Sequence, residues 1–153
     1  MSEGITLKRR YGILLGCLLC LFASSEANAR STFHDLSVKE AAESETGKAK
    51  LLDAPFYMSG QKHAKVARDF GVFTANKRTN AFNKSDEEAC AIAFLSAIIS
   101  LQNRATKLGA NAVVDIKSIT KHNDLVSATQ YRCAAGDVIA NVVLTGRVVK
   151  FQK

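Results

Sequence analysis

The most regular pattern of apolar positions lies between residues 86 and 108. Apolar residues recur there at spacings of four, three, four and seven residues, and three more widen the same stripe: Cys90, Phe94, Ala97, Leu101 and Leu108, with Ala93, Ile98 and Ala105. Such spacing places them on one side of a helix. Ser85 precedes Asp86-Glu87-Glu88 as an N-cap with a capping-box partner three residues on, and Gly109 supplies the left-handed position that ends a helix. The pattern predicts one helix over 86–108 whose apolar stripe faces the core.

Alternating patterns follow this helix and predict three strands. In 112–117 the even positions are apolar, so we expect Ala112, Val114 and Ile116 to be buried and the odd positions to be exposed. Tyr131 and Cys133 share one face of a short strand. The even positions of 138–151 predict a long one-sided strand: Val138, Ala140, Val142, Leu144 and Val148. Polar turns at 122–124 and 136–137 separate the strands.

The segments before the helix give weaker patterns. Residues 56–59 and 65–75 are predicted to be extended, but Phe70 and Phe73 fall on opposite faces, so the buried face stays open. Residues 30–55 are polar and weakly periodic. Ser37 with Glu40 predicts a short helix there, which Gly47 and the proline at 55 would prevent from growing. We expect this segment to be a loosely structured N-terminal arm.

These elements predict the α+β class, with one long helix packed on a small mixed sheet in the order strand-helix-strand-strand-strand, and a single domain over 56–153. A crossover through the helix would make the strands on either side of it parallel if they share a sheet. The chain has 153 residues, 47% hydrophobic and 23% charged. That composition excludes a disordered chain, a collagen-like repeat and a disulfide-dense miniprotein.

The first 29 residues are predicted to be a signal peptide. Three cations at 8–10 precede a 13-residue apolar run over 11–23, and Ala27-Asn28-Ala29 supplies a cleavage site between Ala29 and Arg30. The apolar run is shorter than the about 20 residues that span a bilayer, so we expect no permanent membrane span. One alternative is lipidation at Cys17, because Leu14-Leu15-Gly16-Cys17 loosely resembles a lipoprotein cleavage site. The predicted location is periplasmic or secreted.

Cleavage would leave two thiols, Cys90 and Cys133. A pair of cysteines in an exported protein favours a structural disulfide, with a redox pair and a metal pair or free thiols as alternatives. The three histidines, His34, His63 and His122, are far apart in polar surroundings and are interpreted as surface residues. We therefore predict no metal site and no cofactor.

Basic residues are concentrated before the helix. The chain carries a net charge of +7, or +6 without the first 29 residues, and residues 61–85 alone contribute +5. Six cations there are candidates for anion binding: Lys62, Lys65, Arg68, Lys77, Arg78 and Lys84. The alternative is an ordinary solvated surface. For an exported protein the candidate partners are anionic lipid, lipopolysaccharide and acidic protein, and not nucleic acid.

The stretch Thr79-Asn80-Ala81-Phe82-Asn83-Lys84-Ser85-Asp86-Glu87-Glu88-Ala89-Cys90, with Ala93-Phe94-Leu95-Ser96-Ala97 and Gly109-Ala110-Asn111-Ala112-Val113-Val114, carries a family resemblance. From about 56 to 151 the chain resembles small exported proteobacterial proteins labelled "excinuclease ATPase subunit"-like. More distantly, the helix and the Leu-Gly-Ala-Asn-Ala-Val-Val strand are similar to YbjQ-like and RcsF-like domains. The resemblance implies a Gram-negative source and a fold, and it implies no established activity.

No phosphate-binding loop of the form G-x-x-x-x-G-K-[ST] occurs in the chain, so we reject an ATPase or excinuclease role. No catalytic residues can be assigned from the pattern. Two function classes remain. The first is a non-catalytic exported module that binds or senses something and is stabilised by one disulfide, with anionic envelope components as candidate ligands. The second is an enzyme of unrecognised type, including a thiol-redox enzyme, and the sequence favours the first.

Overall fold

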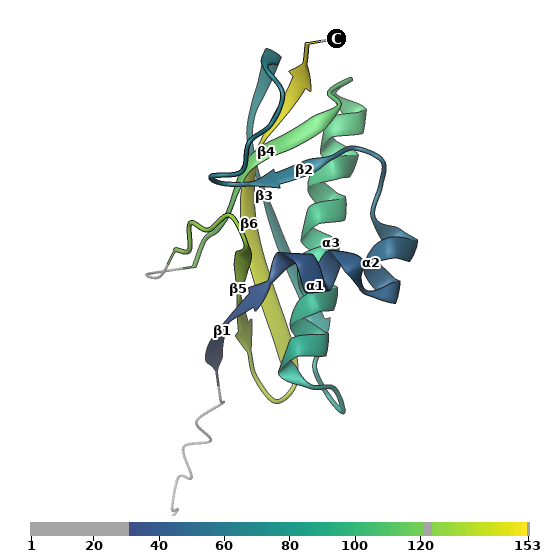
Figure 1. The fold of residues 1–153 in the computed structure, drawn as a ribbon. Helices are drawn as coiled ribbons and strands as arrows, with labels where there is room; N and C mark the ends of the chain where they lie inside the picture. The colour runs from purple at the N-terminus through teal and green to yellow at the C-terminus, as the bar shows by residue number, and fades with distance from the viewer. Residues whose placement is uncertain (1–30, 121–123, 153) are drawn as a thin grey trace, which may run out of the picture.

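The computed structural model describes residues 31–120 and 124–152, which form a sheet with its helices on one face (Figure 1). In chain order the elements are β1 (Thr32–Ser37), α1 (Val38–Glu43), α2 (Glu45–Lys50), β2 (Phe56–Met58), β3 (Val66–Asn80), α3 (Asp86–Lys107), β4 (Ala112–Ser118), β5 (Gln130–Ala135) and β6 (Ile139–Phe151). The predicted α+β class, with one long helix packed on a mixed sheet, is confirmed.

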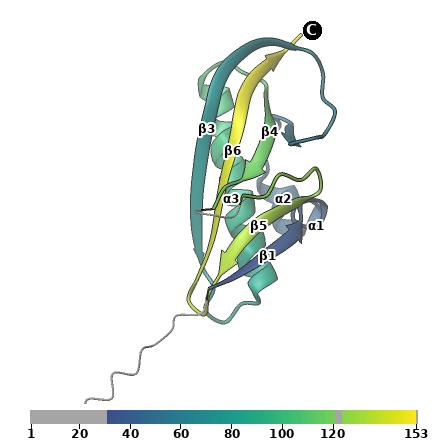
Figure 2. The same ribbon diagram turned by 90° about the vertical axis from the view of Figure 1, so that its left-hand side faces the viewer.

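Strand β6 is the centre of the sheet. It pairs antiparallel with β3 along one edge, and with β5 and then β4 along the other, so β3 and β6 run side by side over the length of the molecule (Figure 2). The strands that flank the helix, β3 and β4, are therefore parallel to each other with β6 between them. On the side of β5 and β4 that faces away from β6, β1 pairs antiparallel with β5 and β2 pairs parallel with β4. This arrangement leaves β3 as an edge strand.

Helix α3 follows the predicted pattern closely. The Ser85 hydroxyl accepts a hydrogen bond from the Glu88 amide at 3.1 Å, and three acidic residues occupy the first turn, where they complement the positive end of the helix dipole. The stripe from Cys90 to Leu101 is buried against the sheet, and Gly109 follows the helix with a φ of 71°. Leu108, predicted on the stripe, is instead 36% exposed, because it is the C-cap beyond the last packed turn.

The predicted alternation of β4 is confirmed for Ala112, Val114 and Ile116, which are buried, but it is wrong for Val113. Val113, expected to be exposed, is fully buried in the main core together with Ile116, while Ala112 and Val114 are buried in a second cluster. A β-bulge at Asp115, which has a φ of 54°, shifts the phase of the strand between these residues. The second cluster includes Tyr57 and Phe151, so both faces of β4 are covered there.

A second bulge resolves the ambiguous face of β3. The pairing with β6 shifts between Asp69 and Val72, where Gly71 takes a φ of 102°, and the extra residue brings both Phe70 and Phe73 against the main core. Arg147 of β6 connects the two bulges. Its guanidinium donates to Asp69 at 3.2 Å and to Asp115 at 2.7 Å.

The segment predicted to be a loosely structured arm is instead part of the fold. Residues 32–37 form the β1 edge of the sheet, and the predicted Ser37 cap is present, accepting from the Glu40 amide at 3.2 Å. Farther along, Gln102 of α3 is 1% exposed and holds the backbone of Leu52 and Ala54 through three hydrogen bonds of 2.7 to 3.1 Å. The prediction failed because these contacts join residues some fifty positions apart, which no local pattern reveals.

The predicted signal peptide, its cleavage point at Ala29, the alternative at Cys17 and the turn residue His122 lie outside the described residues. Among the described helices, α3 is long and apolar enough by composition to cross a membrane, with a mean hydropathy of 1.2. More than half of this apolar stretch of α3 is buried inside the molecule, as in the core helix of a globular domain.

Candidate anion-binding site

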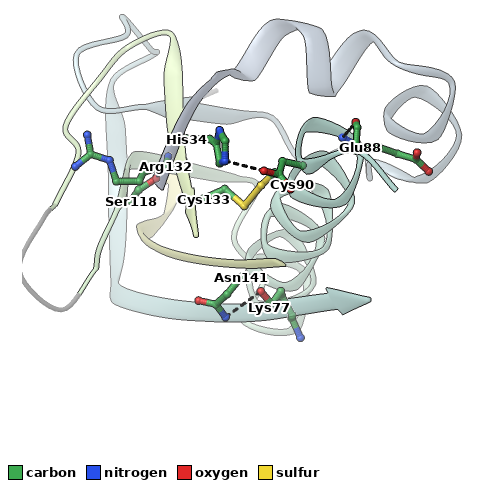
Figure 3. Close-up of a disulfide and its surroundings, with 10 residues drawn as sticks. His34, Lys77, Glu88, Cys90, Ser118, Arg132, Cys133 and Asn141 are labelled. Carbon is green, nitrogen blue, oxygen red and sulfur yellow. Dashed lines mark hydrogen bonds and ion pairs between the residues drawn. A yellow bond between two sulfur atoms is a disulfide. The ribbon is translucent and has the colours of Figure 1, made fainter. Parts of the chain in front are cut away.

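The predicted disulfide is present between Cys90 and Cys133, whose Cα atoms are 5.8 Å apart (Figure 3). It joins the first turns of α3 to the core-facing side of β5, and both residues are fully buried. Beside it, the rings of Phe94 and Tyr131 stack with centroids 4.0 Å apart. Burial, and to a smaller extent the charge of Glu40, raises the pKa of Tyr131, so this phenol stays neutral.

Two side-chain contacts, each involving a carboxylate, attach β1 to its neighbours. His34 Nε2 lies 3.0 Å from an oxygen of Asp86 at the start of α3, and Figure 3 shows this imidazole beside the disulfide. On the opposite face Arg132 donates two hydrogen bonds of 2.6 Å to Asp35. The hydrogen bond from Arg132 lowers the pKa of the Asp35 carboxyl. His34 is thus a structural contact and not a solvated surface residue.

The other described histidine also has a structural environment, since His63 stacks on Phe151 with ring centroids 5.6 Å apart and lies against Tyr57. Over residues 31–120 and 124–152, no group of three His, Cys, Asp or Glu side chains is placed to hold a metal ion.

The six basic candidates do not form one patch. Lys62 and Lys65 lie in the segment between β2 and β3, and Arg68 lies over the Phe70 ring, 4.7 Å from its centroid, at the start of β3. The other three are Lys77 and Arg78 near the end of β3, and Lys84 in the loop before α3. The fifteen residues of β3 span roughly 50 Å at the usual rise of a strand. A run of charge that is continuous in sequence is therefore divided along the edge of the sheet.

One of the six, Lys77, contributes to a groove of about 500 Å³ between β3 and α3. Two cations from α3, Arg104 and Lys107, line the same groove. The remaining lining consists of polar side chains, Thr74, Ser96, Ser100 and Asn103, and of the apolar residues Phe73, Ile99 and Leu101. The groove thus brings together three positive charges and contains no acidic side chain.

Most donors of this groove have no hydrogen-bond or ion-pair partner among the described residues. None of Lys77, Arg104 and Lys107 forms an ion pair among residues 31–120 and 124–152. The hydroxyls of Thr74 and Ser100 likewise form no hydrogen bond within that part of the structure, whereas the Ser96 hydroxyl donates to the Ile92 carbonyl at 2.8 Å. Since unpaired charge attracts counter-charge, the arrangement can bind an anion.

The sequence pattern indicated Lys77 but not Arg104 or Lys107. A local signal does exist for Lys107. Ser96, Ser100, Asn103 and Lys107 follow one another at spacings of four, three and four residues, which is a polar stripe on one side of the helix, and Arg104 lies four residues after Ser100. That stripe has the same period as the apolar one, and its position opposite β3 is visible only in the fold.

Arg78, the neighbour of Lys77, lines a different surface. It borders an apolar depression formed with Phe82, Val138 and Ile139, which are 63%, 62% and 50% exposed. The Ala81 amide donates to the Val138 carbonyl at 2.8 Å, which holds the loop before α3 against the β5–β6 turn. Successive residues of a strand point to opposite faces, so Lys77 and Arg78 line separate surfaces.

Comparison with known proteins adds no relative to this description. No protein-family model matches the chain. No curated protein sequence matches it either.

Proposed function

We propose that this protein is a non-catalytic binding module of the bacterial envelope, and that it binds an anionic envelope component in the groove between β3 and α3. The observation that carries the proposal is the convergence of Lys77, Arg104 and Lys107 on a groove whose lining contains no carboxylate. Charge-assisted hydrogen bonds to an anion are about twice as strong as neutral ones, so such a ligand would gain most from these donors.

The chemistry of the groove favours binding over catalysis. A serine or threonine nucleophile needs an adjacent general base, most often His, Asp or Glu, and none of these residue types lines the groove. The thiol-redox alternative would need an accessible sulfur, whereas Cys90 and Cys133 are both fully buried in their disulfide. The disulfide therefore acts as a structural cross-link.

Export supports the choice of partner. A buried disulfide is consistent with an oxidising compartment. Together with the signal peptide expected over residues 1–29, this supports a periplasmic or secreted location, and the resemblance to small exported proteobacterial proteins points the same way. Anionic ligands available there include lipopolysaccharide, phospholipid headgroups and acidic proteins.

The test is vesicle flotation of the mature, oxidised protein at low and high salt. Vesicles containing phosphatidylglycerol or lipopolysaccharide should carry the protein upward at low salt, and neutral phosphatidylcholine vesicles should not. The variant Lys77→Glu, Arg104→Glu, Lys107→Glu should lose this binding. Because exposed charges are screened within about 10 Å at 0.1 M salt, the wild type should also dissociate as salt rises.

A matched control separates the groove from net charge. The variant Lys62→Glu, Lys65→Glu, Arg68→Glu makes the same change in net charge at the other end of β3 and should retain most of the binding. Circular dichroism and an intact disulfide confirm folding of both variants. If both variants lose vesicle binding equally, binding depends on the overall charge and not on the groove. If both variants still bind, the proposal is wrong.

A further inference from the structure

The groove contains an arginine that packs over an aromatic ring. The Arg104 guanidinium lies over the Phe73 ring, with its central carbon 5.0 Å from the ring centroid. Phe73 is itself partly buried against the main core. A guanidinium that stacks through its face keeps the N–H groups in its plane available, and this planar fork matches phosphoryl oxygens.

Lys77 from the strand and Lys107 from the helix add two point charges to this fork. The carbonyl end of α3 carries roughly half a negative charge, which offsets only part of the charge of the two helix cations, and the strand lysine adds a third positive charge from the other side of the groove. A phosphate monoester carries a charge of about −1.5 to −2 at neutral pH, and a diester carries one charge only. Three unpaired cations therefore favour a monoester over the diester of an ordinary phospholipid.

The groove offers more contacts than a phosphate alone would use. Besides the three cations, it is lined by four neutral polar residues and three apolar residues, over a volume of about 500 Å³. The rest of the lining is rich in neutral hydrogen-bonding groups along one side of α3. Ser100 and Asn103 offer unused donors, and the Ser96 oxygen can accept because its proton is already given to Ile92. Hydroxyl and amide groups of this kind suit a polyhydroxylated ligand.

Resting on the proposed function, we infer that the groove binds a phosphorylated saccharide. Its phosphate monoester is held by Arg104, Lys77 and Lys107, and its sugar hydroxyls meet Ser96, Ser100 and Asn103. The same chemistry occurs in soluble sugar phosphates and in the headgroups of phosphorylated glycolipids. The phosphate provides most of the affinity and the polar stripe provides the selectivity for a sugar.

Calorimetry and amide chemical-shift mapping on the oxidised protein test this inference with glucose 1-phosphate, inorganic phosphate and glucose. Glucose 1-phosphate should shift amides on the facing parts of β3 and α3 and bind several-fold tighter than inorganic phosphate. Glucose alone should not bind. The Lys77→Gln variant should weaken binding about tenfold, since it removes one charge-assisted hydrogen bond. Arg78→Gln, which removes a cation from the adjacent residue of the same strand, should leave binding unchanged.

Flotation with vesicles that contain lipid A, in the presence and absence of glucose 1-phosphate, distinguishes the two sources. Much tighter binding to these vesicles than to the soluble sugar phosphate assigns the ligand to a glycolipid headgroup, and comparable binding assigns it to a soluble sugar phosphate; either outcome supports the inference. Equal affinity for inorganic phosphate and glucose 1-phosphate would overturn it. Groove-dependent binding to phosphatidylglycerol vesicles with no binding of glucose 1-phosphate would overturn it while the proposed function stands, and no binding to any anionic probe would overturn both.

Discussion

Replacement of Gln102 by methionine should detach the N-terminal segment from the long helix. The Gln102 side chain is almost fully buried in α3 and forms three hydrogen bonds with the backbone of Leu52 and Ala54. Its amide nitrogen donates to both carbonyls, and its oxygen accepts from the Leu52 amide. Methionine has a similar length and can occupy the same space, but it can replace none of these bonds.

The magnitude follows from the contacts. A net hydrogen bond contributes about 0.5–1.5 kcal/mol, so three of them amount to roughly 1.5–4.5 kcal/mol. Leu52 is 40% exposed, which lets water reach part of the freed backbone and limits the loss. We therefore expect the free energy of unfolding to fall by about 2–4 kcal/mol, a large fraction of the 5–15 kcal/mol typical of a domain.

Urea denaturation followed by circular dichroism measures this loss, and limited proteolysis between α2 and β2 reports local detachment. Asn103→Met is the control, because it also replaces a side-chain amide by methionine, at the next helix position, which is exposed, and it should alter stability by less than about 0.5 kcal/mol. A loss below about 1 kcal/mol for Gln102→Met, with unchanged proteolysis, would refute the idea that this side chain anchors the segment. Equal losses in the two variants would refute it as well.

Three further predictions concern stability. Breaking the disulfide with the Cys90→Ala, Cys133→Ala variant should lower the free energy of unfolding by about 4 kcal/mol in the chain-entropy model, for a sequence separation of 43 residues, and an unchanged denaturation midpoint would argue against a stabilising cross-link. Gly146→Ala should cost about 1–3 kcal/mol, because its new Cβ would lie 2.8 Å from a core valine; a variant as stable as the wild type in urea would show that the core relaxes freely. The pKa of Asp35 is lowered by Arg132, so their pair stabilises the fold above the unfolded carboxyl pKa and this contribution disappears as the pH falls through the folded value. Since Asp35 is about one-third exposed, Asp35→Asn should remove at most about 1 kcal/mol at pH 7, and this loss should shrink steadily as the pH falls below the unfolded carboxyl pKa; a loss that does not depend on pH would contradict this explanation.

The sequence by itself determined the long helix, its boundaries and its buried side. Those features depend on contacts between residues three or four positions apart, such as the Ser85 cap and the stripe from Cys90 to Leu101. It also determined the inward face of β6, where every second residue from Ala140 to Val148 is buried. The disulfide followed from an even cysteine pair on two faces that were both predicted to be inside.

Tertiary structure decided the features in which distant segments meet. The bulges at Gly71 and Asp115 changed which residues of β3 and β4 are buried, and a bulge depends on how two strands pair. The docking of the N-terminal segment on Gln102 depends on a partner some fifty residues away. The candidate site has the same origin. The sequence shows a run of cations, but the fold separates Lys77 from its neighbours in that run and places it with Arg104 and Lys107. Neighbouring residues of a strand point to opposite faces of the sheet, so Lys77 and Arg78 diverge. Lys77 meets the two helix cations because α3 packs alongside β3.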